Sequence, residues 1–215
     1  MQGRQLGTRE RIVEAAEALF AEHGFENVSL REITNAAGAN VASVNYHFGS
    51  KEKLIEALVE SYTTPLNERR LALLDELEEQ HRGGPVPVEE ILRAFLEPLQ
   101  AQITRSELSD RLFCKFMGRL MNEQGGSCLP ESVEPQFREM VARFAAAFRL
   151  AIPELSEELA LWRIHYSFGV MANTLMHADT LQQISGGRAG VPGFERQLEQ
   201  IIDFCKAGLQ APAST

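Results

Sequence analysis

Apolar side chains recur with a helical period along nearly the whole chain. The first such segment spans residues 8–23, where they fall at the i, i+3, i+4 and i+7 spacing of an amphipathic helix. Its apolar positions are Ile12, Ala15, Ala16, Leu19 and Phe20. No alternating pattern of useful strand length occurs, and no repeat of about 20–50 residues is visible. The pattern predicts an all-α fold.

Capping residues and glycines divide the first 60 residues into short helices. Ser29 and Glu32 have the spacing of a capping box, which predicts a second helix that ends at Gly38. A third short helix is expected over residues 41–47, and a fourth over about 51–62. Two helices of this length, joined by a tight turn, have the proportions of a helix-turn-helix.

Longer helices, separated by glycine and proline, are predicted from Pro65 onward. They are expected at about 65–82, 87–104, 106–124, 132–151, 156–184 and 192–209. Pro98 lies inside an apolar helical pattern and should kink that helix or end it early. We therefore expect two domains, a helix-turn-helix domain over residues 1–58 and a larger helical domain over residues 59–215.

The composition narrows the class of protein. Hydrophobic residues make up 44% of the 215 positions and charged residues 24%, which is typical of a soluble globular protein and not of a disordered one. No run of about 18 apolar residues is present to span a membrane. The N-terminal segment lacks the uninterrupted apolar core of a secretory signal, so a cytoplasmic location is expected.

Catalytic and metal-site motifs are missing from the sequence. Cys114, Cys128 and Cys205 are widely spaced, without a CxxC pair or a nearby pair of histidines, and are expected to be reduced thiols. No nucleophile elbow, HExxH, phosphate-binding loop or dinucleotide fingerprint occurs. We expect no enzymatic activity, no metal and no cofactor.

The third short helix has the composition of a DNA-reading helix. Gly38 suits the turn before it because glycine adopts positive φ without a Cβ clash. Val44 and Phe48 can point inward at i, i+4 spacing, which leaves small and hydrogen-bonding side chains to approach base edges and phosphates. The candidate DNA contacts are Ser29, Arg31, Asn40, Val41, Ala42, Ser43, Asn45, Tyr46, His47 and Lys51.

Residues 9–58 closely resemble the DNA-binding domain of TetR-type transcriptional regulators. The matching stretches are Arg11-Ile12, Ala15-Ala16, Leu19-Phe20, Gly24-Phe25, Val28 to Ile33, Ala36 to Ala39 and Val44 to Leu54. The resemblance implies that Tyr46, His47 and Lys51 meet the phosphate backbone. It also implies that Val41, Ala42, Ser43 and Asn45 lie nearest the bases. Many members of the family have Leu-Tyr where this chain has Val44-Asn45, so Asn45 is a candidate to read a base edge.

The larger domain is rich in phenylalanine and methionine. Such side chains are either plain core or the lining of an adaptable apolar cavity, and the resemblance favours a cavity because TetR-type proteins hold an inducer in this domain. The candidate lining residues are Phe95, Phe113, Phe116, Met117, Met121, Phe144, Phe148, Phe168 and Met171. Arg119, Arg163 and His165 are candidates to receive a ligand carboxylate, or are paired within the protein.

The C-terminal part also resembles, more loosely, the fatty-acid-responsive subgroup of TetR-type regulators. The likeness is carried by residues 161–169 and 203–209, together with residues 45–51. It implies a small apolar effector, a fatty acid or acyl thioester, that releases a repressor from a pseudo-palindromic operator in double-stranded DNA. The alternatives are a repressor that senses multidrug or aromatic compounds, and a helical interaction protein that does not read DNA.

The last two predicted helices have the character of a homodimer interface. Apolar positions form one stripe on the helix at 156–184 and another on the helix at 192–209. The stripes comprise Leu159, Trp162, Tyr166, Val170 and Leu181, and then Phe194, Leu198, Ile201, Ile202 and Cys205. Dimerisation is needed because one seven-residue helix makes too few contacts for tight operator binding.

The net charge of -9 limits where DNA can bind. Residues 1–53 carry six basic and seven acidic side chains, whereas the remaining residues carry 15 and 23. The negative charge therefore belongs almost wholly to the larger domain. The first domain is not basic either, so its cations must gather on one side to attract phosphates.

Overall fold

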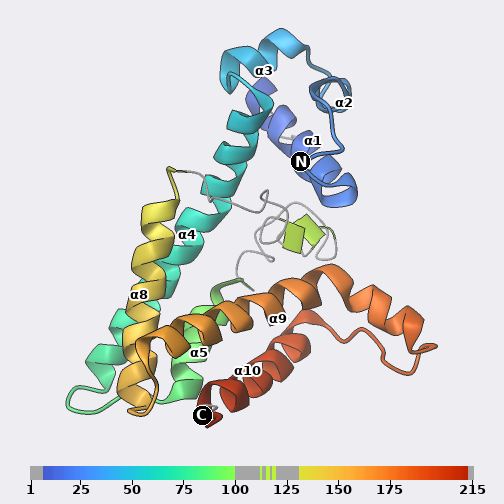
Figure 1. Ribbon diagram of the computed structural model, residues 1–215. Coiled ribbons are helices and arrows are strands. Elements are labelled where there is room, and N and C mark those ends of the chain that lie inside the picture. Colours follow the sequence, from blue (N-terminus) through green and yellow to red (C-terminus); the bar gives the residue numbers. More distant parts are fainter. Residues whose placement is uncertain (1–6, 100–111, 113–114, 117, 120–130, 213–215) are drawn as a thin grey trace, which may run out of the picture.

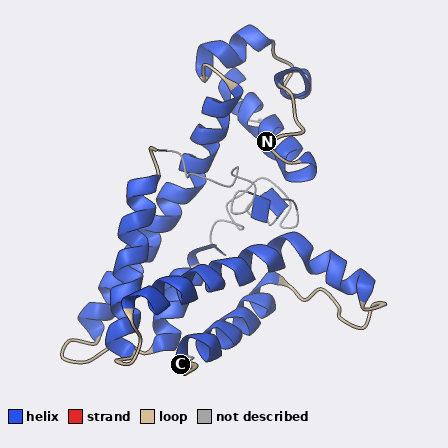
Figure 2. Ribbon diagram, in the orientation of Figure 1, coloured by secondary structure: helices blue, strands red, loops and turns tan. Residues whose placement is uncertain are grey.

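The chain is helical throughout the residues that the structure describes. The computed structural model describes residues 7–99, 112, 115–116, 118–119 and 131–212. Within these residues there are helices and loops but no strand, as Figure 2 shows, which confirms the all-α prediction. The helices are α1 (Thr8–His23), α2 (Leu30–Ala36), α3 (Val41–His47), α4 (Lys51–Gln80), α5 (Val88–Leu96), α8 (Glu134–Ala151), α9 (Glu157–Ile184) and α10 (Phe194–Gln210).

Helix α4 connects two groups of helices (Figure 1). The short helices α2 and α3 pack with α1 at the N-terminal end of α4, while α5, α8, α9 and α10 gather toward its other end. Leu54 and Leu58 of α4 are buried near its N-terminus, and Leu66 and Leu74 are buried further along. The predicted boundary between residues 58 and 59 therefore falls inside one continuous helix that belongs to both groups.

The prediction of a helix break near Pro65 was wrong. Pro65 lies inside α4, which runs without interruption through residues 51–80. Proline removes one backbone hydrogen bond and crowds the preceding turn. Burial of Leu58 and Val59 on one side of it and of Leu66 on the other holds both halves in one helix.

The second proline prediction is confirmed. Helix α5 ends at Leu96, two residues before Pro98 and earlier than the predicted end near residue 104. The predicted helices at 132–151, 156–184 and 192–209 correspond to α8, α9 and α10 within two residues at each end. Most of the predicted helix at 106–124 lies outside the described residues; Leu112 and residues 115–116 and 118–119 are helical.

The core runs through both groups of helices. Its largest fully buried side chains are Phe20, Phe95, Phe116, Phe144, Phe148, Ile12, Ile33, Leu54, Leu58, Leu74 and Ile91. Each of these contributes about 1.5–3 kcal/mol when it leaves water. Among the described residues, no helix is both long and apolar enough to cross a membrane.

Candidate DNA-binding surface and effector region

The predicted capping box sets the start of α2. The backbone N–H of Ser29 donates to Glu32 Oε2 over 2.7 Å, and the N–H of Glu32 donates to Ser29 Oγ over 3.3 Å. These bonds satisfy N–H groups that the first turn of a helix leaves without partners. Ser29 and Arg31 are exposed at this end of α2, where a phosphate can be approached.

Helix α3 turns one face into the protein and leaves the other open. Val44 is fully buried and Phe48 half-buried, as their spacing predicts. Tyr46 is 86% exposed, so it belongs to the outer face and not to the core. The exposed side chains of this helix are Val41, Ala42, Asn45, Tyr46 and His47. They are five of the ten predicted DNA contacts, and the structure brings them together on one surface.

Asn40 and Ser43 have a structural task at the start of α3. Asn40 Oδ1 accepts from the backbone N–H of Ser43 over 2.9 Å and from Ser43 Oγ over 3.1 Å. Asn40 is therefore the N-cap of the helix. Gly38, in the preceding turn, has φ +58°, the positive value that the sequence predicted.

The N-terminus of α4 lies directly after α3. Ser50 caps it by accepting from the backbone N–H of Lys53 over 3.2 Å, and Lys51 is its first residue. Arg9 lies on the other side of the same region, with its guanidinium 5.2 Å from the centre of the Phe48 ring. The helices that adjoin α3 thus carry basic side chains, Arg9 on α1, Arg31 on α2 and Lys51 on α4.

Four of the predicted ligand residues belong to two clusters of aromatic rings. In the first, which we call the Phe95 cluster, the Phe95 ring lies 5.0 Å from that of Phe144 and 4.8 Å from that of Phe168. Phe95, Phe144, Phe148 and Met171 are buried, and Phe168 is half-buried. This cluster is drawn from α5, α8 and α9.

The second cluster lies where the larger group of helices meets the helix-turn-helix. Phe116 is fully buried, with its ring 6.1 Å from Phe25 and 5.3 Å from Tyr62. The hydroxyl of Tyr62 donates to Glu17 of α1 over 2.7 Å. Phe116 thus contacts the helix-turn-helix domain, and among the described rings it is paired with Phe25 and Tyr62 and not with those of the Phe95 cluster. Phe113, Met117 and Met121 lie outside the described residues.

The three predicted carboxylate receivers are not brought together. Arg119 donates from Nε to the carbonyl of Ala21 over 3.0 Å and from Nη2 to that of Glu22 over 3.2 Å, at the C-terminal end of α1. His165 is exposed on α9, with its ring 5.8 Å from that of Trp162.

Arg163 of α9 packs against the C-terminal end of α10. It is 9% exposed, and its guanidinium donates to the carbonyls of Leu209, Ala211 and Pro212. Spacing alone could not reveal this role, because the carbonyls lie 46 or more positions away. A ligand role for Arg119, Arg163 or His165 remains a prediction, although the two arginines already have main-chain acceptors.

Comparison with known proteins decides the family. Residues 12–58 match the profile of the bacterial regulatory proteins of the tetR family, and residues 93–208 match that of the tetracyclin repressor-like C-terminal domain. The chain belongs to the TetR family. This confirms the resemblance read from residues 9–58, and it places the chain among regulatory proteins, in agreement with the expectation that it is not an enzyme.

Curated relatives share either the first domain or most of the chain. The repressor AcnR of Corynebacterium efficiens is 42% identical over 53 residues, which cover 25% of this chain and 28% of that protein. AcrR of Shigella flexneri is 28% identical over 174 residues, covering 78% of each chain. RaaS of Mycobacterium tuberculosis is 27% identical and covers 89% of this chain and its own whole length. The match to AcnR thus spans less than a third of that relative.

Solved structures show the same fold. AmtR of Mycobacterium smegmatis superposes with a TM-score of 0.61 at 19% identity, covering 99% of this chain and 91% of that chain. SmeT, the repressor of the Stenotrophomonas maltophilia multidrug efflux pump SmeDEF, gives a TM-score of 0.59 at 22% identity, covering 98% and 96%. The TetR fold therefore extends over both groups of helices.

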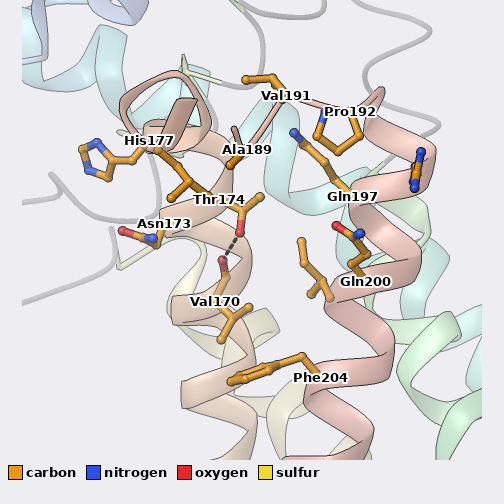
Figure 3. A pocket seen from close by; sticks show the side chains of 14 residues that line it. Val170, Asn173, Thr174, His177, Ala189, Val191, Pro192, Gln197, Gln200 and Phe204 are labelled. Atoms are coloured by element: carbon orange, nitrogen blue, oxygen red, sulfur yellow. Dashed lines mark hydrogen bonds between the residues drawn. The ribbon is translucent and has the colours of Figure 1, made fainter. Parts of the chain in front are cut away.

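A pocket of about 650 Å³ opens between α9, α10 and the loop that joins them in this TetR-family chain (Figure 3). Gln197 and Gln200 line it from α10, and Thr174 lines it from α9, where its hydroxyl donates to the Val170 carbonyl over 2.8 Å. Among the predicted ligand residues that the structure describes, none lines this pocket. Phe204 forms part of its apolar wall.

The same two helices expose large apolar side chains. They are Leu161, Trp162, Tyr166, Leu181 and Ile184 on α9 and Phe204 on α10. Trp162 is 50% and Phe204 67% exposed, and the rings of Trp162 and Tyr166 stack 5.9 Å apart. We call these six residues the α9–α10 apolar surface.

The predicted interface stripe on α10 was wrong in detail. Leu198, Ile201, Ile202 and Cys205 are buried inside one protomer, because this face of α10 packs on α5 and α9. Burial also raises the pKa of the Cys205 thiol, which agrees with a reduced, unreactive cysteine. The large apolar side chain that α10 exposes is Phe204, at a position that the stripe did not include.

One buried charge was missed by sequence reasoning. Arg70 of α4 is 2% exposed, and its guanidinium lies 4.8 Å from the Phe95 ring centre and 5.5 Å from that of Phe168. The signal was present in the spacing, because Arg70 lies four residues after Leu66 and four before Leu74, which are both buried. Among the described residues, no cluster of histidine, cysteine and carboxylate side chains is arranged to hold a metal.

Proposed function

We propose that the chain is a homodimeric transcriptional repressor that a small apolar effector releases from a pseudo-palindromic operator. The observation that carries this proposal is the division of α3 into two faces. Val44 anchors the helix in the core, while Asn45, Tyr46 and His47 are exposed, and the neighbouring helices carry basic side chains. A helix of this kind can enter the major groove, with Asn45 reading a base edge and its neighbours meeting phosphates.

Dimerisation through α9 and α10 provides the second copy of α3 that binding to a two-fold operator requires. The α9–α10 apolar surface comprises six exposed large apolar side chains, three of them aromatic, which favours burial against a second copy. In a two-fold dimer both protomers use the same surface, so this surface would pack against its own copy on the partner. Two copies of α3 then bind two half-sites, and their binding energies add.

The signal between the two regions runs through α4 and α1. Helix α4 belongs to both groups of helices, and Arg119 and Tyr62 bond to α1 at Ala21, Glu22 and Glu17. An effector that prefers one arrangement of the larger domain therefore also displaces the reading helices. It must bind that arrangement more tightly, since equal affinity for both would shift nothing. A coupling of about 1–3 kcal/mol is typical.

The effector favoured here is a fatty acid or an acyl thioester. The Phe95 cluster offers an apolar lining, and the C-terminal part resembles the fatty-acid-responsive subgroup. A repressor that senses multidrug or aromatic compounds is the second candidate, favoured by the fold shared with SmeT. A helical interaction protein that does not read DNA is disfavoured by the exposed face of α3.

A gel-shift titration with DNA from upstream of the chain's own coding region tests the regulator. The proposal expects protected half-sites and a steep loss of affinity as salt is raised, because phosphate contacts release counterions. Binding without sequence preference would contradict it. Native mass spectrometry of freshly purified protein tests the effector: a co-purified fatty acid supports the subgroup, and an aromatic compound supports the second candidate.

A further inference from the structure

Arg70 is a buried cation without a buried anion. Its Nε donates to the carbonyl of Phe95 over 2.7 Å, and its Nη1 donates to Asn67 Oδ1 over 3.1 Å. Neither acceptor is charged, and no carboxylate pairs with Arg70 in the described part of the chain. A guanidinium taken out of water without a counter-charge is unfavourable, so such groups are normally paired. Burial lowers the pKa of Arg70 to about 9, and the group therefore stays charged at neutral pH.

Asn67 supplies a second donor at the same place. Its side chain is 2% exposed, and its Nδ2 has no hydrogen-bond partner. Because Oδ1 already accepts from Arg70, the amide is oriented with its donor end free. A buried donor without an acceptor is itself unfavourable by about 1–3 kcal/mol. Both neighbouring groups can therefore donate to an acceptor oxygen, and the uncompensated charge of Arg70 favours an oxygen that carries negative charge.

The structural task of Arg70 does not use the whole guanidinium. The bond to Phe95 caps one of the last carbonyls of α5, and a single donor is enough for that. The described residues leave Nη2 of Arg70 with no acceptor. A neutral cap would do the same work at α5 without burying a charge.

The surroundings are apolar and aromatic. The rings of Phe95 and Phe168 lie against the guanidinium of Arg70, and the Phe95 ring also packs on that of Phe144. Guanidinium groups bind carboxylates with two parallel hydrogen bonds. Phenyl rings pack against alkyl chains and against other aromatic rings.

We propose that Arg70 and Asn67 bind the carboxylate of the effector, an organic acid whose apolar body lies along the Phe95 cluster. This inference rests on the proposed effector role of the larger domain and adds to it the chemical class of the ligand. It replaces Arg119, Arg163 and His165 as receivers of the charge.

The test compares charged and neutral probes on the full-length protein. Isothermal titration is carried out with decanoate, 1-naphthoate and the neutral 1-decanol. At least one carboxylate is expected to bind tenfold or more tightly than 1-decanol. A preference for decanoate identifies an acyl acid and a preference for 1-naphthoate an aromatic acid. Equal binding of 1-decanol, or no binding of either carboxylate, overturns the proposal.

Two variants and a control locate the site. Arg70→Met should abolish the preference for the carboxylate. Asn67→Asp keeps Arg70 and supplies an internal carboxylate, so it should raise the melting temperature and weaken carboxylate binding at least tenfold. The control is Arg143→Met. Arg143 lies on α8 and pairs with Asp75 and Glu78, which lie on α4 as Arg70 does. This variant should keep the preference for the carboxylate. If Arg70→Met does not fold, Asn67→Asp decides, and unchanged carboxylate binding in it overturns the proposal.

The failure of this inference is distinguishable from failure of the proposed function. Each preparation is also assayed for DNA binding by gel shift. Release of DNA by 1-decanol as effectively as by decanoate leaves the regulator standing and removes the anion site. Carboxylate binding without sequence-specific DNA binding supports the anion site and contradicts the proposed regulator.

Discussion

Arg119 reaches across 98 positions of sequence to the end of α1, where its Nε donates to the Ala21 carbonyl over 3.0 Å. Helix α1 ends at His23, so this carbonyl is among the last four, which have no partner within the helix. A guanidinium is also favoured there by the helix dipole. The contact joins the region expected to bind the effector to the helix that supports the reading helix.

Replacing Arg119 with methionine should weaken this connection. We expect the free energy of unfolding to fall by about 1.5–3 kcal/mol, the range for hydrogen bonds that involve a charged group. Urea denaturation measures it. Arg138→Met is the control, because within the described part of the chain Arg138 pairs only with the exposed Glu134, and its loss should change stability by less than about 0.5 kcal/mol. Equal losses in the two variants would show that the contact with α1 has no special weight.

Two positions of α3 should separate binding from folding. Tyr46→Ala removes an exposed side chain and should weaken operator binding roughly tenfold without lowering the melting temperature. Val44→Ala removes buried methyl groups and should lower stability by about 2 kcal/mol. A Tyr46→Ala protein that unfolds would mean that Tyr46 belongs to the core.

The capping box of α2 should make stability depend on pH. The side chain of Ser29, and then its backbone N–H, donate to the Glu32 carboxyl and hold its pKa below the ordinary value. The stabilisation is present above the ordinary carboxyl pKa and is lost as the pH falls through the lowered value. Glu32→Gln should therefore be less stable than the wild type at neutral pH, and the difference should shrink in acid. Urea titrations at several pH values check this, and a difference that grows in acid would contradict it.

The α9–α10 apolar surface should control the oligomeric state. Phe204→Asp places a charge where a partner would bury it, and it should weaken dimerisation about 100-fold or more. Leu150→Asp is the matched control, since Leu150 is equally exposed but lies on α8. Sedimentation velocity across a range of concentrations distinguishes the two. A Phe204→Asp protein that remains dimeric would place the interface elsewhere.

Local signals in the sequence predicted most of the helices of the helix-turn-helix domain. The pair Ser29 and Glu32 fixed the start of α2, and the spacing of Val44 and Phe48 gave the inner face of α3, because capping and period depend on residues three or four positions apart. Pro65 could not be judged in this way. Whether a helix continues through proline depends on tertiary packing on both sides, which sequence spacing does not contain.

The arginines of the larger domain show the same limit. Arg119 and Arg163 were expected near a ligand, but each donates to main-chain carbonyls far away in sequence. Arg70 was overlooked because charged residues are assumed to lie in solvent, although its spacing from Leu66 and Leu74 placed it on the buried stripe of α4. Partners of long side chains are a product of the fold and not of local pattern.

Selection of binding sites from a random DNA library tests the central claim most directly. The wild-type protein, and Tyr46→Ala as its matched control, are each incubated with the library at physiological salt, and the retained sequences are determined. A homodimer with α3 as its reading helix predicts an inverted repeat whose half-sites lie one helical turn or a multiple of it apart, with enrichment strongly reduced for Tyr46→Ala. Enrichment of sequences without two-fold symmetry, or equal enrichment by both proteins, would contradict the account.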